Sequence, residues 1–153
     1  MIHIYYGCGK GKTTAALGAG MRAFGAGMSV ALVQLLKDNK SSEISAVPFK
    51  VFNAPDCVKF NPGEEYMPCV KNACEFIKNV DADVIILDEF LDAIPDYISE
   101  ETALDLLNRN AEYIITGHKR VDSIFSRADY ITFMKKEKHP HDKGVCARLG
   151  IEY

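Results

Sequence analysis

The residues best suited to chemistry lie near the start of the chain, between a short apolar segment and a helix-forming stretch. They form the run Gly7-Cys8-Gly9-Lys10-Gly11-Lys12-Thr13-Thr14. Glycines let successive backbone N–H groups point into one concavity, the start of a helix adds partial positive charge, and Lys12 adds a full one. Thr13 can offer its hydroxyl to a magnesium ion. The run predicts a phosphate-binding loop whose eight residues contact a nucleotide, and a purely structural glycine turn is the alternative.

The spacing of this loop differs from the common pattern. The usual motif has a glycine five positions before its Gly-Lys pair, and here that position is Tyr6. The nearest upstream glycine is Gly7. The variant spacing indicates a variant placement of the phosphates.

A second feature is the segment Asp83-Val84-Ile85-Ile86-Leu87-Asp88-Glu89, an apolar run that ends in two carboxylates. Continuous apolar runs are typical of parallel strands buried on both faces. Ligands of open α/β sheets bind beyond the carboxyl ends of such strands, so Asp88 and Glu89 are expected at the same edge as the loop. Residues 113–116 form a similar run, which places Thr116, Gly117 and His118 there too. Asp88 and Glu89 are interpreted as Walker B residues.

The elements that position these groups alternate along the chain. We expect strands over residues 2–6, 28–36, 49–52, 83–89, 113–116 and 130–134. Helices are expected over 12–24, 66–79 and 99–109, followed by a short one capped by Asp122. Alternating strands and helices predict an α/β fold with a mostly parallel sheet and helices on both faces, in a single domain over residues 1–153.

Composition excludes several classes of function. The formal net charge of −3 argues against a nucleic-acid partner, so an anionic ligand must be attracted locally. No apolar run approaches the roughly 20 residues of a membrane span, and no basic and apolar leader precedes the first strand, so we expect a cytoplasmic protein. The five cysteines contain no Cys-x-x-Cys pair, which favours reduced thiols. Catalysis by Cys8 is disfavoured, as is metal binding by His139, His141 and Cys146.

Taken together, the motifs resemble those of the ATP:corrinoid adenosyltransferases, a family that adenosylates cob(I)alamin and related corrinoids. The loop is similar to that family's own variant, and the sequel Ala15-Ala16-Leu17-Gly18 with Arg22 also corresponds. The other matching segments are Val33-Gln34-Leu35-Leu36-Lys37, Leu87-Asp88-Glu89, Ile115-Thr116-Gly117, Lys138-His139-Pro140, Asp142, Gly144, Ala147-Arg148 and Gly150-Ile151-Glu152-Tyr153. These matches span almost the whole chain in the family's order.

The resemblance implies a RecA-like P-loop fold, usually a homodimer, that transfers the 5′-deoxyadenosyl group of ATP to cobalt(I) and releases triphosphate. Lys12, Thr13 and Glu89 are then the expected catalytic residues, because they neutralise charge on the leaving triphosphate. Magnesium would be held by Thr13 and Glu89, with Asp88 as the second choice. Arg22 is expected to contact the nucleotide, and a reductase is expected to supply cobalt(I).

The sequence departs from the family pattern at two places. His118 stands where the family has Arg, which replaces a permanent charge with a titratable one. The chain has no Trp, so the aromatic corrinoid loop of the family has no clear counterpart; Phe60 is the candidate for stacking on the corrin.

Two other functions stay open at this point. One is a P-loop ATPase or kinase, and the other is a non-catalytic protein that binds ATP or a corrinoid.

Overall fold

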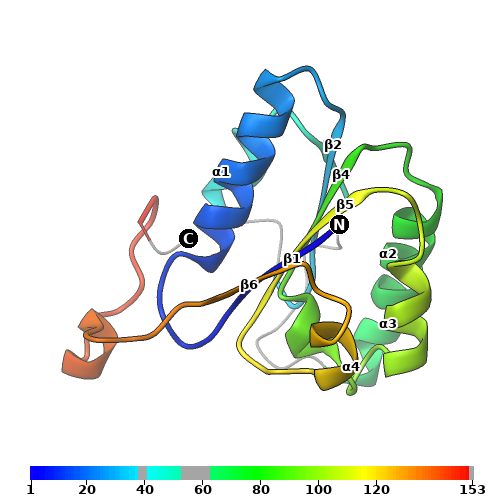
Figure 1. The fold of residues 1–153 in the computed structure, drawn as a ribbon. Coiled ribbons are helices and arrows are strands. Elements are labelled where there is room, and N and C mark those ends of the chain that lie inside the picture. The colour runs from blue at the N-terminus through cyan, green and yellow to red at the C-terminus, as the bar shows by residue number, and fades with distance from the viewer. Residues whose placement is uncertain (38–40, 53–62, 152–153) are drawn as a thin grey trace.

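A computed structural model describes residues 1–37, 41–52 and 63–151 of the chain. A six-stranded sheet runs through its centre in the order β3-β2-β4-β5-β1-β6, and every neighbouring pair is parallel (Figure 1). The strands are β1 (Ile2–Tyr6), β2 (Val30–Gln34), β3 (Lys50–Val51), β4 (Val84–Asp88), β5 (Glu112–Gly117) and β6 (Tyr130–Phe133). This confirms the α/β class expected from the sequence, with a sheet that is parallel throughout.

Helices cover both faces of the sheet. Helix α1 (Lys12–Gly25) lies on one face, and α2 (Met67–Asn79) and α3 (Glu100–Leu106) lie on the other (Figure 1). The short helix α4 (Asp122–Phe125) precedes β6. One-turn 3-10 helices are η1 (Ser42–Ser45), η2 (Glu64–Tyr66), η3 (Phe90–Ala93) and η4 (Pro140–Lys143).

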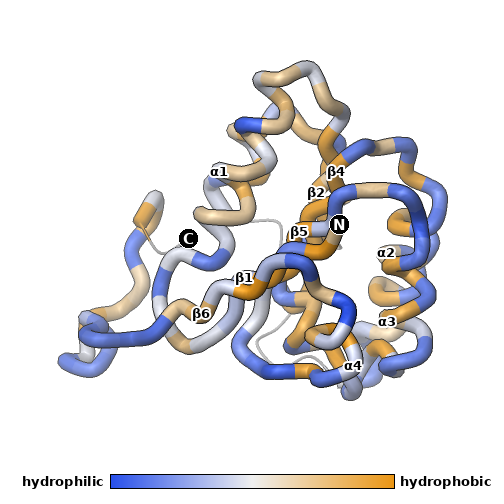
Figure 2. Tube along the Cα trace, viewed as in Figure 1, coloured by the Kyte–Doolittle hydropathy of each residue, from blue (hydrophilic) through white to orange (hydrophobic). Residues whose placement is uncertain are grey.

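Strand β4 shows why the central strands are apolar at every position. Val84 and Ile86 pack in the core beneath α1, whereas Ile85 and Leu87 pack in the larger core beneath α2 and α3. Alternate residues of a strand point to opposite faces, so a strand covered on both faces needs an unbroken apolar sequence. Figure 2 shows the central strands mostly in the hydrophobic colour, whereas α2 and α3 carry both hydrophobic and hydrophilic residues.

Helix α1 approaches the sheet closely at Gly20. A Cβ atom there would lie 2.6 Å from the Cδ1 atom of Ile86. Gly18 on the same helix has open space around the corresponding position. A glycine at position 20 therefore allows the helix that begins after the glycine-rich loop to lie directly against β4.

The expected elements are present, with shifted ends. The predicted strand over 28–36 is shorter as β2, and the predicted helix over 99–109 is shorter as α3. Ser99 caps α3 by accepting a hydrogen bond from the Thr102 N–H at 3.2 Å. The prediction that Asp122 caps the following helix was wrong: Val121 is the N-cap and Asp122 is the first helical residue, where its charge favours the helix dipole.

Two further points concern membrane-spanning helices and the position of Phe60. Within the described residues, no helix has the length and apolar character that crossing a bilayer requires. Phe60, proposed to stack on a corrin, lies outside the described residues.

Candidate active site

The loop between β1 and α1 is fastened to the ends of two neighbouring strands. The Gly7 N–H donates to the Gly117 carbonyl at 3.1 Å, and the Gly9 N–H donates to the Met134 carbonyl at 2.7 Å. Gly7 has φ +113°, and a Cβ atom there would lie 2.7 Å from the Met134 carbonyl oxygen. These two N–H groups therefore hold the loop in place, and the donors available to a phosphate come from the residues that follow.

Lys12 lies at the first turn of α1, where such donors are concentrated. The first N–H groups of a helix lack intrahelical acceptors and carry its positive dipole end. The Lys12 side chain is buried, with its Nζ atom 3.2 Å from the Gly9 carbonyl oxygen and 3.4 Å from His118 Nε2. Its charge is thus enclosed by the loop that precedes it.

Asp88, at the end of β4, is the centre of a hydrogen-bonded network and is fully buried. Its Oδ1 atom accepts from the Thr13 hydroxyl at 2.9 Å and from the Thr116 hydroxyl at 2.6 Å. Its Oδ2 atom accepts from Gln34 Nε2 at 3.2 Å and pairs with Lys37 Nζ at 2.7 Å. The carboxylate therefore joins the start of α1, directly after the glycine-rich loop, to strands β2, β4 and β5.

Lys37 brings a second ammonium group to the site. Its Nζ atom lies 3.2 Å from Thr13 Oγ1, 2.7 Å from Asp88 Oδ2 and 3.8 Å from Glu89 Oε1. Burial alone would lower the pKa of Lys37, but the adjacent Asp88 carboxylate reverses this and raises it. The three oxygens that surround this ammonium are the expected metal ligands of the site.

Glu89 has a left-handed backbone conformation, with φ 57°, that turns the chain sharply out of β4. Its N–H donates to the Thr116 hydroxyl at 2.9 Å, which fixes the turn. Burial is the main cause that raises the pKa of the Glu89 carboxyl to about 7, and the charge of neighbouring Asp88 adds to it. Near neutral pH the site therefore holds a carboxyl that a cation can readily deprotonate.

Asp92 and His118 complete the far side of the site. The Asp92 carboxylate accepts from the His118 backbone N–H at 2.8 Å and lies 2.9 Å from His118 Nδ1. Burial of Asp92 opposes ionisation, but the hydrogen bonds from His118 prevail and lower its pKa to about 2. The same hydrogen bond raises the pKa of His118. The two residues thus form an ion pair when the histidine is protonated.

The structure brings together most of the predicted site residues. Lys12, Thr13, Asp88 and Glu89 meet at the carboxyl ends of the strands, as expected. Cys8, Lys10 and Thr14 are exposed, and Lys10 Nζ donates to the Ile151 carbonyl at 2.8 Å. Arg22 is exposed in the last turn of α1, about 15 Å along the helix axis from Lys12, and is not brought to the loop.

The remaining candidates outside the loop stay apart from this site. His139 and His141 lie in and beside η4, where the His141 N–H donates to His139 Nδ1 at 3.2 Å. Over the described part of the chain, the three-residue group with metal-ligand spacing is Glu89, Asp92 and His118, and the tail histidines belong to no such group. Cys8, Cys69, Cys74 and Cys146 form no disulfide with one another.

Sequence reasoning placed Thr116 at this edge but missed two residues of the site, Lys37 and Asp92. The position of Lys37 just beyond an apolar strand was a usable signal. Nothing in the sequence pattern distinguishes Asp92, because its place depends on the left-handed turn at Glu89.

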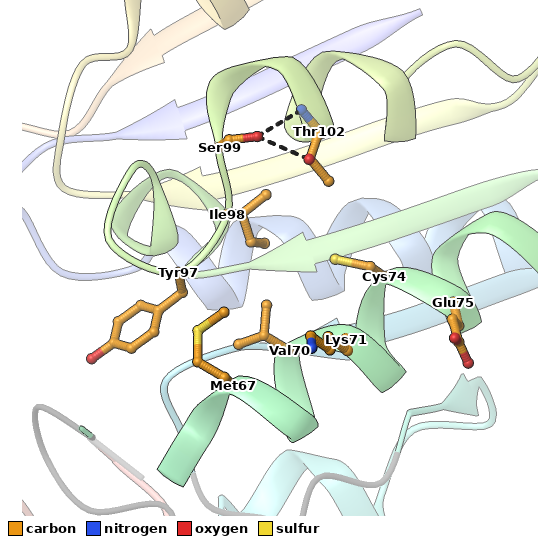
Figure 3. A pocket seen from close by; sticks show the side chains of 9 residues that line it. All are labelled: Met67, Val70, Lys71, Cys74, Glu75, Tyr97, Ile98, Ser99 and Thr102. Carbon is orange, nitrogen blue, oxygen red and sulfur yellow. Dashed lines mark hydrogen bonds between the residues drawn. The ribbon is translucent and has the colours of Figure 1, made fainter. Parts of the chain in front are cut away.

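A separate hollow of about 320 Å³ lies between α2 and the segment that leads into α3. Figure 3 shows its lining side chains, with the Ser99 cap of α3 at one end. Cys74 lines this hollow, and burial raises the pKa of its thiol. A protonated thiol is a weak nucleophile, so the hollow offers no chemistry comparable to that of the loop.

Comparison with known proteins agrees with the resemblance noted from the motifs. The family model for "ATP:corrinoid adenosyltransferase BtuR/CobO/CobP" matches residues 1–153. A corrinoid adenosyltransferase of Escherichia coli K12 is 30% identical over the whole chain and 85% of its own length. Corrinoid adenosyltransferase CobA of Salmonella typhimurium is also 30% identical, with the same coverage. The protein of that name in Pseudomonas aeruginosa is 28% identical, over the whole chain and 83% of its own length. The chain therefore belongs to the ATP:corrinoid adenosyltransferase family.

Proposed function

We propose that this protein transfers the 5′-deoxyadenosyl group of ATP to the Co(I) of a reduced corrinoid, releases triphosphate, and serves adenosylcobalamin synthesis or salvage. Family membership and the names of its relatives support this activity. The structural observation that carries it is the convergence of Lys12, Thr13 and Glu89 at the start of α1. The site thus collects positive charge and metal-binding oxygens where a triphosphate would lie.

The triphosphate is expected to bind across the first turn of α1. Lys12 supplies charge from within the loop, and the first-turn N–H groups supply donors. The Lys12 ammonium now contacts the Gly9 carbonyl, so it has an oxygen partner to exchange for a phosphate oxygen. In this reaction the triphosphate is the leaving group, and electrostatic stabilisation of its developing charge is the main task of these residues.

The residues present fit a magnesium ion. Oxygen atoms from Thr13, Asp88 and Glu89 already surround one cation, the Lys37 ammonium. Thr13 and Glu89 would hold the metal, and Asp88 would orient the Thr13 hydroxyl through the 2.9 Å hydrogen bond. Bound magnesium would neutralise charge on the triphosphate oxygens.

The transfer itself needs no nucleophile from the protein. The electron pair of Co(I) forms the bond to C5′ of the ribose, the C5′–oxygen bond breaks, and its electron pair leaves with the triphosphate. The Co(I) of the corrinoid substrate is the nucleophile, and the protein aligns the reactants. Alignment of this kind can contribute about 7 to 11 kcal/mol to a rate.

The test is anaerobic incubation of the protein with cob(I)alamin, ATP and magnesium. Adenosylcobalamin, seen by its visible spectrum, and triphosphate should form in equal amounts. ADP and phosphate in place of triphosphate would instead identify a P-loop ATPase or kinase. ATP binding with no turnover would identify a non-catalytic binding protein.

Lys12→Ala tests the role assigned to the loop. Loss of a charge-assisted contact of about 1.5 to 3 kcal/mol should weaken ATP binding roughly ten- to a hundredfold. Titration calorimetry measures the affinity, and circular dichroism checks the fold. Lys71→Ala, on the exposed surface of α2, is the matched control and should bind ATP as the wild type does. If Lys12→Ala bound ATP with unchanged affinity, the proposal that the triphosphate binds at this loop would be wrong.

We further propose a homodimer, a reductase that supplies Co(I), and a cytoplasmic location. The edge strand β6 exposes Tyr130, Ile131 and Phe133, an apolar surface that supports self-association. Free thiols among the described residues support a reducing compartment. Analytical ultracentrifugation tests the dimer, and a mass of 17.0 kDa would refute it.

A further inference from the structure

Glu89 presents its two carboxylate oxygens to different neighbours. Oε1 faces Lys37 Nζ at 3.8 Å, on the side of Thr13 and Asp88, whereas Oε2 faces His118 Nδ1 at 3.6 Å. Asp92 Oδ2 lies 2.9 Å from the same Nδ1 atom. One ligand atom from each of Glu89, Asp92 and His118 lies within 4.8 Å of the other two.

These spacings suit a single small cation. Two donor atoms bound at about 2.1 Å to one ion lie roughly 3.0 to 3.4 Å apart at octahedral or tetrahedral angles. The 2.9 Å and 3.6 Å separations lie close to that range. The two distances from His118 Nδ1 are therefore close to those that coordination of one ion requires.

The backbone holds the three side chains in this arrangement. The left-handed turn at Glu89 starts η3, which places Asp92 against the end of β5. The His118 N–H fixes the Asp92 carboxylate at 2.8 Å. Gly117 leaves the necessary room, because a Cβ atom there would lie 2.6 Å from Leu91 Cβ and 3.1 Å from Asp92 Oδ2.

The donor set defines the class of ion. Magnesium prefers six oxygen ligands, whereas an imidazole nitrogen with two carboxylates suits first-row transition metals. We propose that Glu89, Asp92 and His118 form a second cation site, specific for a first-row transition-metal dication, beside the triphosphate site. Glu89 then bridges two cations through its two oxygens, in the manner of two-metal sites with ions about 3.5 to 4 Å apart.

Coordination at His118 Nδ1 has a consequence for the nucleotide. The remaining nitrogen, Nε2, then carries the proton and lies on the side of Lys12, at 3.4 Å from Nζ in the present structure. When Lys12 turns to a phosphate, this N–H is a second donor beside it. The bound ion thus gives a histidine the fixed positive character that the family's arginine has at this position.

The test uses Mn²⁺ alone, without nucleotide or corrinoid, so its outcome does not depend on the proposed adenosyl transfer. Electron paramagnetic resonance measures free Mn²⁺ during the titration, and spin-echo modulation detects nitrogen bound directly to the ion. The wild type should show nitrogen modulation from bound Mn²⁺. His118→Ala should lose that modulation, and His118→Ala and Asp92→Asn should each weaken Mn²⁺ binding about tenfold or more.

Two control variants separate this site from its surroundings. Thr13→Ala removes the hydroxyl of the magnesium site, and His141→Ala removes an exposed histidine of the tail; both should keep the affinity and the modulation. His118 is half exposed, so its replacement should leave the fold intact, which circular dichroism checks. Absence of nitrogen modulation in the wild type, or equal weakening by Thr13→Ala and His118→Ala, would overturn the proposal.

Discussion

Replacing Glu89 with glutamine should stabilise the protein at neutral pH while removing a residue of the proposed active site. The pKa of Glu89 is raised from 4.5 to about 7, mainly because burial disfavours the ionised carboxylate, of which 16% is exposed. A change in pKa of this size corresponds to about 3 kcal/mol. Ionised Glu89 is therefore a source of instability in the free protein.

The sign of the effect follows from linkage. Below pH 4.5 the carboxyl is protonated in both the folded and the unfolded chain, so ionisation costs no stability. The cost grows as pH rises from 4.5 and is complete above about 7, where both states are ionised. Glutamine cannot ionise, so the advantage of Glu89→Gln over the wild type should increase by about 3 kcal/mol between pH 4.5 and pH 8.

Urea unfolding across this pH range, in buffer free of divalent ions and nucleotide, measures the difference. Near pH 8 the variant should also melt roughly 6 to 12 °C above the wild type. Glu75→Gln, on the exposed surface of α2, is the matched control and should show no such trend. A stability difference between Glu89→Gln and wild type that stays constant with pH would refute the assigned burial of this charge.

Two further substitutions test the elements around the site. Gly20→Ala should destabilise the protein by about 1 to 3 kcal/mol because its methyl group meets Ile86, whereas Gly18→Ala, in open space on the same helix, should stabilise it by up to about 1 kcal/mol; equal thermal shifts in the two variants would contradict the close packing of α1. Lys37→Met should lower the free energy of unfolding by about 3 kcal/mol because it leaves the buried Asp88 carboxylate without its cation, and magnesium should restore more stability to this variant than to the wild type. Urea unfolding with and without magnesium decides this, and an equal gain in both proteins would contradict the shared position of lysine and metal.

The sequence predicted those parts of the site that depend on strand ends. The carboxyl ends of parallel strands lie at one edge of a sheet, so the loop after β1, Asp88 at the end of β4 and Thr116 in β5 could be placed together from the sequence. The α/β class followed from the same alternation of apolar runs and helical periods. Family membership was predictable because matching motifs extend to the last residues of the chain.

The parts that could not be predicted depend on single backbone angles. Leu36 and Glu89 both adopt positive φ, at 56° and 57°, although neither residue type favours it. The first lies next to Lys37, whose ammonium points at Asp88, and the second brings Asp92 beside His118. Hydrophobic periodicity carries no information on such turns, so the places of Lys37 and Asp92 in the site could not be predicted from the sequence.

The hydrogen bond from Gly9 ties the proposed nucleotide site to the segment that follows β6. The acceptor for Gly9 is Met134, directly after the edge strand β6, and the chain then returns to Lys10 at Ile151 (Figure 1). The loop is thus joined through Gly7 to the end of β5, and through Gly9 and Lys10 to residues 134 and 151, which follow β6. A tag, truncation or partner that displaces β6 would therefore also displace the loop at which the triphosphate is proposed to bind.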